Sequence, residues 1–254
     1  MNPDLALALE LADIADAVSM RRFRATDLRV DTKGDGTPVT DADRQVEERL
    51  RETLRLHRPG HGVCGEEYGV DGSVDWRWYV DPIDGTRNYE RGVPVWATLI
   101  ALRHKDVSVC GVVSAPALRR RWWAARGEGA GATGSAPLRV SRVADLSDAF
   151  VSCTDPRDFD APSRADGFRH LVTTCRTVRA FGDFWSHVLV AEGALDVGIE
   201  AAVNAWDVAP LQVIVEEAGG RMTDFEGRPR IDSGTVITSN GLLHDAVVDL
   251  FRSS

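Results

Sequence analysis

The distribution of apolar residues predicts two helices followed by a run of strands in the first part of the chain. Apolar positions recur at helical spacing over residues 3–23 and 41–56, and a residue that can cap a helix precedes each segment. Shorter apolar runs follow and predict strands at about 61–65, 76–81, 95–103, 107–115 and 121–126. Short turns separate the last three of these runs, which predicts an antiparallel meander.

After about residue 148 the pattern changes to single strands alternating with helices. The helical spacing predicts helices near 163–173, 184–193, 207–218 and 241–251. A block of strands followed by such an alternation is typical of a layered α/β protein. A chain of 254 residues with 43% apolar composition is long enough to form one large domain or two closely packed halves.

The segment Asp-Pro-Ile-Asp-Gly-Thr at residues 81–86 follows the strand predicted at 76–81. Asp81 and Asp84 are hard oxygen ligands, and the proline and glycine between and after them favour a turn that brings the two carboxylates toward one Mg²⁺-sized point. Gly85 and Thr86 offer backbone N–H groups at the start of a short helix, where phosphate binds well. An acidic surface turn with Asp84 as a helix cap is the alternative for this motif alone.

Two other acidic positions accompany this motif. Glu66 and Glu67 follow Gly65 at the end of the strand predicted at 61–65, and Asp207 opens the helix predicted at 207–218. Each has a simple structural explanation, because paired acids are usually solvated and an aspartate at a helix start is usually a cap. The three positions together, in this order along the chain, form a pattern.

Charge and cysteine usage narrow the class of protein. The net charge of −9 argues against non-specific nucleic-acid or anionic-membrane binding, and an acidic enzyme that handles phosphate needs metal cations to offset repulsion. The N-terminal residues lack a signal-peptide pattern, and no apolar segment approaches the ~20 residues of a membrane span. The four cysteines, at positions 64, 110, 153 and 175, are widely spaced and form no CxxC pair. This spacing predicts that Cys64, Cys110, Cys153 and Cys175 are free thiols, which fits a cytoplasmic location.

The ordered motifs Gly-Glu-Glu, Asp-Pro-Ile-Asp-Gly-Thr and Trp-Asp-Val-Ala resemble the inositol monophosphatase family of Mg²⁺-dependent, lithium-sensitive phosphatases. The similarity extends from Lys33 to Asp245, and within that family the chain is most similar to bacterial histidinol-phosphate phosphatases. The resemblance implies a layered αβαβα sandwich. It also implies an N-terminal half, residues 1–147, with an antiparallel sheet and most metal ligands, and a C-terminal half, residues 148–254, that completes the metal site and substrate pocket. The stretches that support the subfamily are 91–102, 111–125, 182–196 and 240–247.

The resemblance also implies a set of metal ligands. Glu66, Asp81 and the carbonyl of Ile83 would hold a first Mg²⁺, and Asp81, Asp84 and Asp207 would hold a second. Four carboxylates balance two divalent ions, and an incoming phosphate favours a third ion near Glu66. The implied reaction is in-line attack of a metal-activated water on phosphorus, without a covalent enzyme intermediate.

Three residues are implied to act on the attacking water: Thr86, Asp43 and the metal ligand Glu66. Thr86 is expected to hydrogen-bond Asp43, and this pair would orient the water and help to deprotonate it. A capping box that joins Thr40 to Asp43 is the structural alternative. Lys33 matches a lysine in the family's mobile flap, and a solvated loop charge is its alternative.

The substrate is expected to be a small phosphate monoester, most specifically L-histidinol phosphate. Asp183 and Glu200 would face the leaving group and bind its cationic ammonium and imidazole. In inositol phosphatases the acid that matches Glu200 binds hydroxyls, which is the alternative. Trp185 and His187 either contact substrate or pack in the core. Because residues 152–162 depart from the expected subfamily pattern, inositol-1-phosphate, an aminosugar phosphate or a nucleotide remain alternative substrates.

Two other classes are less compatible with the motifs. Haloacid-dehalogenase-like phosphatases use an aspartyl nucleophile with a second acid two positions away, whereas Asp81 and Asp84 are three positions apart. A phosphate sensor would not need the complete set of expected ligands. The resemblance further implies a homodimer that binds neither nucleic acid nor membrane.

Overall fold

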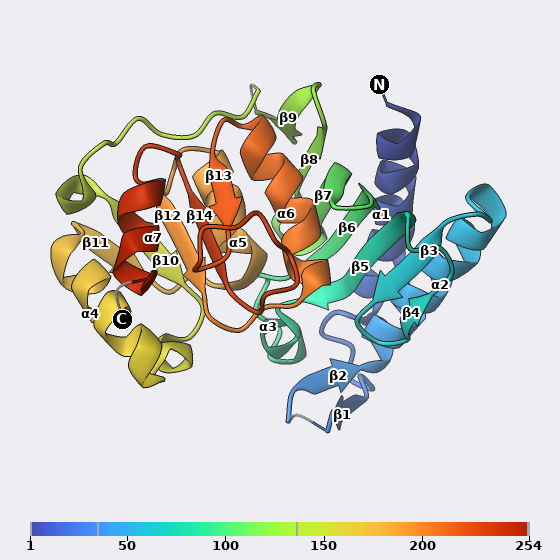
Figure 1. Cartoon of the computed structure of the whole chain (residues 1–254). Helices are drawn as coiled ribbons and strands as arrows, with labels where there is room; N and C mark the ends of the chain where they lie inside the picture. The colour runs from blue at the N-terminus through green and yellow to red at the C-terminus, as the bar shows by residue number, and fades with distance from the viewer. Residues whose placement is uncertain (1, 35, 136, 253–254) are drawn as a thin grey trace.

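The computed structural model describes residues 2–34, 36–135 and 137–252, which form five layers in the order αβαβα (Figure 1). The layered α/β fold predicted from the sequence is confirmed. Two helices cover the outer face of a seven-stranded sheet, two lie between the sheets, and two cover the outer face of a five-stranded sheet. In that order the helices are α1 (Pro3–Arg22), α2 (Asp41–His57), α5 (Asp183–Ala191), α6 (Ala205–Glu217), α4 (Pro162–Thr174) and α7 (His244–Arg252).

The seven-stranded sheet contains the predicted meander, in which β6, β7 and β8 pair antiparallel. One pair in this sheet, β3 with β5, is parallel, so the carboxyl ends of these two strands lie at the same edge. The spatial order is β4 (Gly69–Asp71), β3 (Gly62–Gly65), β5 (Trp76–Asp84), β6 (Ala97–His104), β7 (Val107–Ala115), β8 (Arg120–Ala125) and β9 (Gly129–Ala132).

The five-stranded sheet combines parallel and antiparallel pairs. Its strand β10 pairs parallel with β11 and β12, whereas β14 pairs antiparallel with β12 and β13. The spatial order is β11 (Thr177–Arg179), β10 (Phe150–Cys153), β12 (Val197–Glu200), β14 (Val236–Ser239) and β13 (Arg221–Thr223). Outside both sheets lie the ribbon of β1 (Val30–Thr32) and β2 (Pro38–Thr40), the helix α3 (Thr86–Glu90), and 3-10 turns at Pro116–Leu118, Leu146–Asp148 and Pro156–Phe159.

The predicted helices and strands agree with the structure to within a few residues, with three differences. Strand β5 continues through Asp84, so the acidic motif belongs to the end of the strand instead of a turn after it. Helix α7 begins at His244, three residues later than predicted. The short strands β1, β2, β4, β9, β11 and β13 had too few apolar residues to produce a signal.

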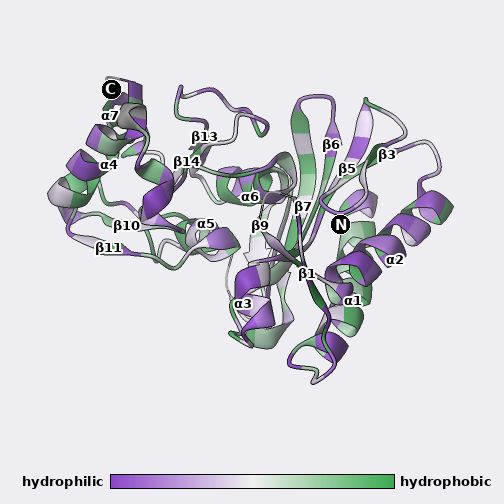
Figure 2. Ribbon diagram, turned by 90° about the horizontal axis from the view of Figure 1, so that it is seen from below, coloured by the Kyte–Doolittle hydropathy of each residue, from purple (hydrophilic) through white to green (hydrophobic). Residues whose placement is uncertain are grey.

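Burial of apolar faces explains the layering. Trp78, Val80 and Ile100 are fully buried between the seven-stranded sheet and α1 with α2. The opposite face of that sheet packs on α5 and α6, with Leu99 and Val113 at the contact. Figure 2 shows hydrophobic residues along α1 and β7 and mostly hydrophilic residues along α2. The amphipathic pattern of α2 therefore places one face in the core and the other in solvent.

Helix α6 packs very closely on the seven-stranded sheet. A Cβ atom on Gly111 of β7 would lie 2.7 Å from the carbonyl oxygen of Pro210 in α6, so only glycine permits this approach. The same helix also contacts β13 of the other sheet. The division into halves at residue 147 stays a prediction, because α6 belongs by sequence to the second half and packs largely on the first.

Two further expectations concern cysteines and membrane spans. All four cysteines have free thiols, and three of them are buried. Within the described ranges, none of the helices has the length and apolar character that crossing a membrane requires.

Candidate active site

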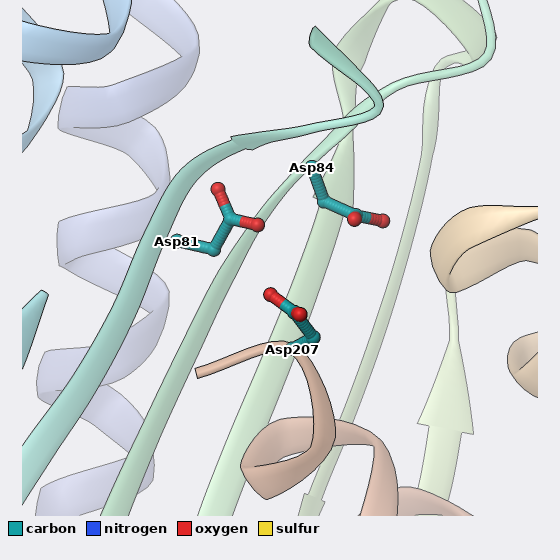
Figure 3. A group of neighbouring side chains, drawn as sticks. All are labelled: Asp81, Asp84 and Asp207. Atoms are coloured by element: carbon teal, nitrogen blue, oxygen red, sulfur yellow. The ribbon is translucent and has the colours of Figure 1, made fainter. Parts of the chain in front are cut away.

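Three aspartates lie together at the end of β5, where this strand meets the start of α6 (Figure 3). One carboxylate oxygen from each of Asp81, Asp84 and Asp207 lies within 4.8 Å of the other two. The sequence separation between Asp84 and Asp207 shows that the fold assembles this group from two distant segments. These three predicted ligands are thus brought together.

The parallel pairing of β3 and β5 places Glu66 beside this group. Gly65 is opposite Val80 in the register, so the residues that follow them, Glu66 at the end of β3 and Asp81 within β5, lie side by side. The backbone N–H of Glu66 donates to the carbonyl of Val80 at 3.2 Å. Two predicted ligands are therefore positioned by one strand pair.

An irregularity in β5 explains how Asp81 and Asp84 reach a common point. The pairing of β5 with β6 shifts between these two residues, which is a bulge in the strand. Within the bulge, the N–H of Ile83 donates to Oδ1 of Asp81 at 2.9 Å. Gly85 then adopts a left-handed φ of 81°, which glycine accepts without strain, and α3 begins at Thr86.

Asp207 is held in the first turn of α6, which begins at Ala205, two residues earlier than predicted. Its Oδ2 accepts the backbone N–H of Asn204 at 2.7 Å. Helix capping, which the sequence offered as the simple explanation, therefore coexists with membership of the acidic group.

Burial and mutual repulsion raise the pKa values of these acids. Burial raises the pKa of Asp81 well above its usual range, and Glu66, Asp84 and Asp207 raise it further. Burial likewise raises the pKa of Asp84, with repulsion from Asp183 and Asp207. The pKa of Asp207 is raised to about 7, again mainly by burial. A divalent cation would relieve this repulsion, and the closely spaced hard oxygen donors fit Mg²⁺.

Lys33 pairs with the two glutamates beside the aspartates. Its Nζ lies 2.7 Å from Oε1 of Glu66 and 2.6 Å from Oε1 of Glu67. The alternative of a solvated loop charge is therefore wrong for this structure. In the glycine-rich loop that follows Lys33, residue 35 lies outside the described residues.

Asp43 makes both of the interactions that the sequence analysis considered for it, one with Thr40 and one with Thr86. Its Oδ2 accepts from the backbone N–H of Thr40 at 2.8 Å and from the Thr40 hydroxyl at 2.5 Å, which forms the capping box of α2. Its Oδ1 lies 3.4 Å from the hydroxyl of Thr86, which also donates to the carbonyl of Ile83 at 2.9 Å. Burial raises the pKa of Asp43 to about 7. The expected contact between Thr86 and Asp43 is thus present and long.

A pocket adjoins the aspartate group and contains both predicted substrate-binding acids. Asp84 and Asp207 form one part of its lining, and Asp183 and Glu200 form another. Glu200 is only 4% exposed. Apolar side chains form the remaining wall, among them Leu99, Val203, Val208, Leu211 and Met222.

A hydrogen-bond network joins the two parts of the pocket. The Thr154 hydroxyl donates to Oε1 of Glu200 at 2.6 Å and accepts the backbone N–H of Asp183 at 2.7 Å. The next N–H, of Phe184, donates to Oδ2 of Asp84 at 2.7 Å. Asp183 has a φ of 51°, which is unusual for a residue other than glycine. The start of α5 thus fixes a metal-ligand candidate and a substrate-binding candidate in one rigid arrangement.

The ionisable groups of the pocket are strongly perturbed. Burial raises the pKa of Glu200 to about 8, and that of Asp183 to about 6. Burial lowers the pKa of His187 to about 4. The Nδ1 atom of His187 lies 2.7 Å from the Thr238 hydroxyl, and its Nε2 lies 4.0 Å from Glu200. His187 is therefore both a core residue and part of the pocket lining, whereas Trp185 packs against the core beside it.

Two pocket residues come from the segment whose sequence departs from the expected pattern. Thr154 and Asp158 lie in residues 152–162 and line the pocket with Asp183 and Glu200. The sequence analysis did not single them out, because neither belongs to a motif and a loop position becomes informative only after folding. The segment does border the predicted substrate pocket, as expected.

The αβαβα layers and the acidic group beside a polar pocket define the class of metal-dependent phosphoric monoester hydrolases. The chain belongs to the inositol monophosphatase family, whose model matches residues 1–254.

Individual relatives and solved structures agree with this assignment. The chain is 53% identical over 252 residues to a histidinol-phosphatase of Mycobacterium tuberculosis, with 97% of each chain covered. It is 48% identical over 253 residues to a histidinol-phosphatase of Streptomyces coelicolor, covering 96% of this chain and 95% of the relative. Among solved structures, an IMPase of Thermotoga maritima is similar with a TM-score of 0.88 and 30% identity, covering 99% of this chain and 98% of that one.

Proposed function

We propose that this protein hydrolyses L-histidinol phosphate to L-histidinol and phosphate in a Mg²⁺-dependent reaction. The observation that supports this most is the pocket that joins two of the clustered aspartates to Glu200, Asp183 and Asp158. A phosphate at the aspartates would leave the rest of the substrate among three carboxyl groups. Histidinol carries an ammonium and an imidazole, which such a pocket binds well.

The acidic group supplies the ligands for the metal. Asp81, Asp84 and Asp207 would hold one Mg²⁺, while Glu66, Asp81 and the Ile83 carbonyl would hold another. A third ion near Glu66 is inferred from the charge that the phosphate adds. When bound, Mg²⁺ supplies a Lewis acid that makes water more acidic and neutralises phosphate charge. The number of ions, two or three, belongs to this proposal.

The residues around α3 orient the reactants. Thr86 and Asp43 would hold the attacking water, with Glu66 as a further acceptor for its proton, and the N–H groups of Gly85 and Thr86 would bind phosphate oxygens. The buried carboxyl of Asp43, with its pKa near 7, suits the transfer of a proton at neutral pH.

Replacing Thr86 with valine tests this role. Valine keeps the shape of the side chain and removes the hydroxyl, so we expect kcat to fall about a hundredfold, as the loss of proton-transfer assistance predicts. The matched control is Thr53→Val, which removes an exposed hydroxyl that bonds only its own helix. Steady-state kinetics at saturating Mg²⁺ provide the measurement. A Thr86→Val enzyme as fast as the control would remove Thr86 from the mechanism.

Replacing Glu200 with glutamine tests recognition of the leaving group. We expect the ratio of kcat/KM for histidinol phosphate to that for inositol-1-phosphate to fall about tenfold to a hundredfold, because a hydrogen bond to a charged group is lost. Glu192→Gln is the control, since it removes a carboxylate that accepts from the Trp122 indole outside the pocket. An unchanged ratio in Glu200→Gln would show that Glu200 does not distinguish leaving groups.

A substrate screen tests the specific assignment directly. Phosphate release with Mg²⁺ is measured for histidinol phosphate, inositol-1-phosphate, an aminosugar phosphate and a nucleoside monophosphate. Histidinol phosphate is expected to give the highest kcat/KM. If several unrelated phosphates match it, the substrate assignment fails, and the phosphatase assignment is unaffected.

The remaining features of the proposal are inferred from the family resemblance. They are a homodimer and inhibition by millimolar lithium in place of the second Mg²⁺. A cytoplasmic location is proposed separately, on the basis of the four free thiols. Light scattering and a lithium titration check the first two.

A further inference from the structure

A buried glutamate lies beneath the turn that contains Glu66. Glu47 is on α2, one helical turn after Asp43, and is 0% exposed. A buried carboxylate is costly unless strong partners compensate it. Its partners therefore indicate what the fold holds in place at this position.

The carboxylate of Glu47 accepts two backbone N–H groups from the turn. Its Oε2 accepts from Glu67 at 2.7 Å, and its Oε1 accepts from Tyr68 at 3.2 Å. The first of these donors belongs to the peptide that joins Glu66 to Glu67. Glu47 therefore restrains the backbone torsion on the C-terminal side of Glu66.

Arg51 compensates the charge and holds the other end of the same turn. Its Nε donates to Oε1 of Glu47 at 2.7 Å, its Nη1 lies 3.0 Å from Oδ2 of Asp71, and its Nη2 donates to the carbonyl of Gly69 at 2.5 Å. The turn from β3 to β4 is thus attached to α2 at several points.

The residue before Glu66 is Gly65, and its backbone lies directly against the carboxylate of Glu47. A Cβ atom on Gly65 would lie 2.0 Å from Oε1 of Glu47, so a larger residue would displace the carboxylate. Strand β3 can end this close to α2 only because residue 65 is glycine.

From these contacts we infer that Glu47 is a positioning residue for the metal site, which fixes the backbone of Glu66 so that its carboxylate stays beside Asp81. This inference rests on the proposed function, because it takes Glu66 as a ligand. Partners that orient metal ligands typically contribute ten- to a hundredfold in metal affinity or activity. Glu47 acts through Glu66 and Glu67 and is not expected to contact substrate.

Glu47→Gln tests the inference. A glutamine directs its amide nitrogen at either Arg51 or the backbone donors, so one contact is lost. We expect the Mg²⁺ dissociation constant in calorimetric titrations without substrate, and the Mg²⁺ concentration for half-maximal activity, to rise about tenfold or more. At saturating Mg²⁺, kcat should stay within about threefold of wild type, because the metal ligands themselves are intact.

A second variant covers the possibility that Glu47→Gln fails to fold. Glu47→Met with Arg51→Met replaces the buried ion pair by apolar side chains, which often preserves stability, and removes the acceptors of the turn. The control is Glu192→Gln, which replaces a carboxylate paired with Arg120 by a neutral amide elsewhere in the molecule. Both variants and the control are compared at a temperature well below their unfolding midpoints.

The outcomes separate this inference from the proposed function. A folded Glu47→Gln or double variant with a Mg²⁺ dissociation constant within twofold of wild type overturns the role of Glu47. Glu66→Gln is measured in parallel. If Glu66→Gln also leaves Mg²⁺ binding unchanged, the assignment of Glu66 as a ligand fails. If Glu66→Gln weakens Mg²⁺ binding while the variants at Glu47 do not, only the positioning role fails.

Discussion

Replacing Asp84 with asparagine is expected to lower kcat about a thousandfold at saturating Mg²⁺, since loss of metal-dependent charge stabilisation amounts to several kcal/mol and each 1.36 kcal/mol is tenfold. Asparagine still offers an oxygen to the N–H of Phe184, so the contact between the motif and α5 is retained. The change therefore removes a ligand charge without removing the hydrogen bond that orders this part of the fold.

The control for this prediction is Asp245→Asn, which removes an aspartate charge at an exposed ion pair with Arg221. It should leave kcat within about twofold, because surface pairs contribute little. The unfolding midpoint of Asp84→Asn without Mg²⁺ is expected to equal or exceed that of wild type, because repulsion in the acidic group decreases. Turnover of Asp84→Asn close to that of the control would contradict the ligand assignment.

Removal of divalent metal is expected to abolish turnover and to make stability fall as the pH rises. The pKa of Asp207 is raised to about 7, and those of Asp81 and Asp84 lie well above their usual range. A carboxyl group whose pKa is raised by folding contributes most below its unfolded pKa near 4, and this contribution is lost as the pH passes its folded pKa. The metal-free protein should therefore lose stability between pH 5 and about 8.

Mg²⁺ should reverse this loss, because it binds the ionised form of the acids. At a concentration a hundred times its dissociation constant it contributes about 2.7 kcal/mol. For a chain of this size that corresponds to a rise of roughly 5–10 °C in the unfolding midpoint. Thermal unfolding at pH 5 and pH 8, with Mg²⁺ or chelator at matched ionic strength, measures the effect. A rise no larger at pH 8 than at pH 5, or full turnover in excess chelator, would contradict the prediction.

The sequence predicts most of the helices and strands and the clustered aspartates well because these follow from local patterns, whereas the αβαβα order was implied by the family resemblance. Apolar spacing identifies α1, α2 and the strands of the meander, and the motif around Asp81 and Asp84 combines residue types that few structural needs would bring together. The bulge that joins these two acids was not predicted, because it depends on pairing with β6.

The roles of residues that belong to no sequence motif became visible only in the structure. Glu47 and Arg51 are spaced like an ordinary ion pair on an exposed helix face, and only the approach of β3 shows that both are buried. Thr154 and Asp158 lie in a loop whose path no periodicity describes. In each case the sequence does not reveal the tertiary contact, that is, which helix or strand lies opposite a given side chain.

The close packing of α6 on β7 has a consequence for the acidic group of Asp81, Asp84 and Asp207. Asp207 is in the first turn of the helix whose Pro210 rests against Gly111, and the strand of Gly111 contributes no residue to this group. A methyl group at position 111 would push the helix outward and carry Asp207 with it, away from Asp81. The distance between Asp207 and Asp81 therefore depends partly on the absence of a side chain at Gly111, in the middle of the sheet.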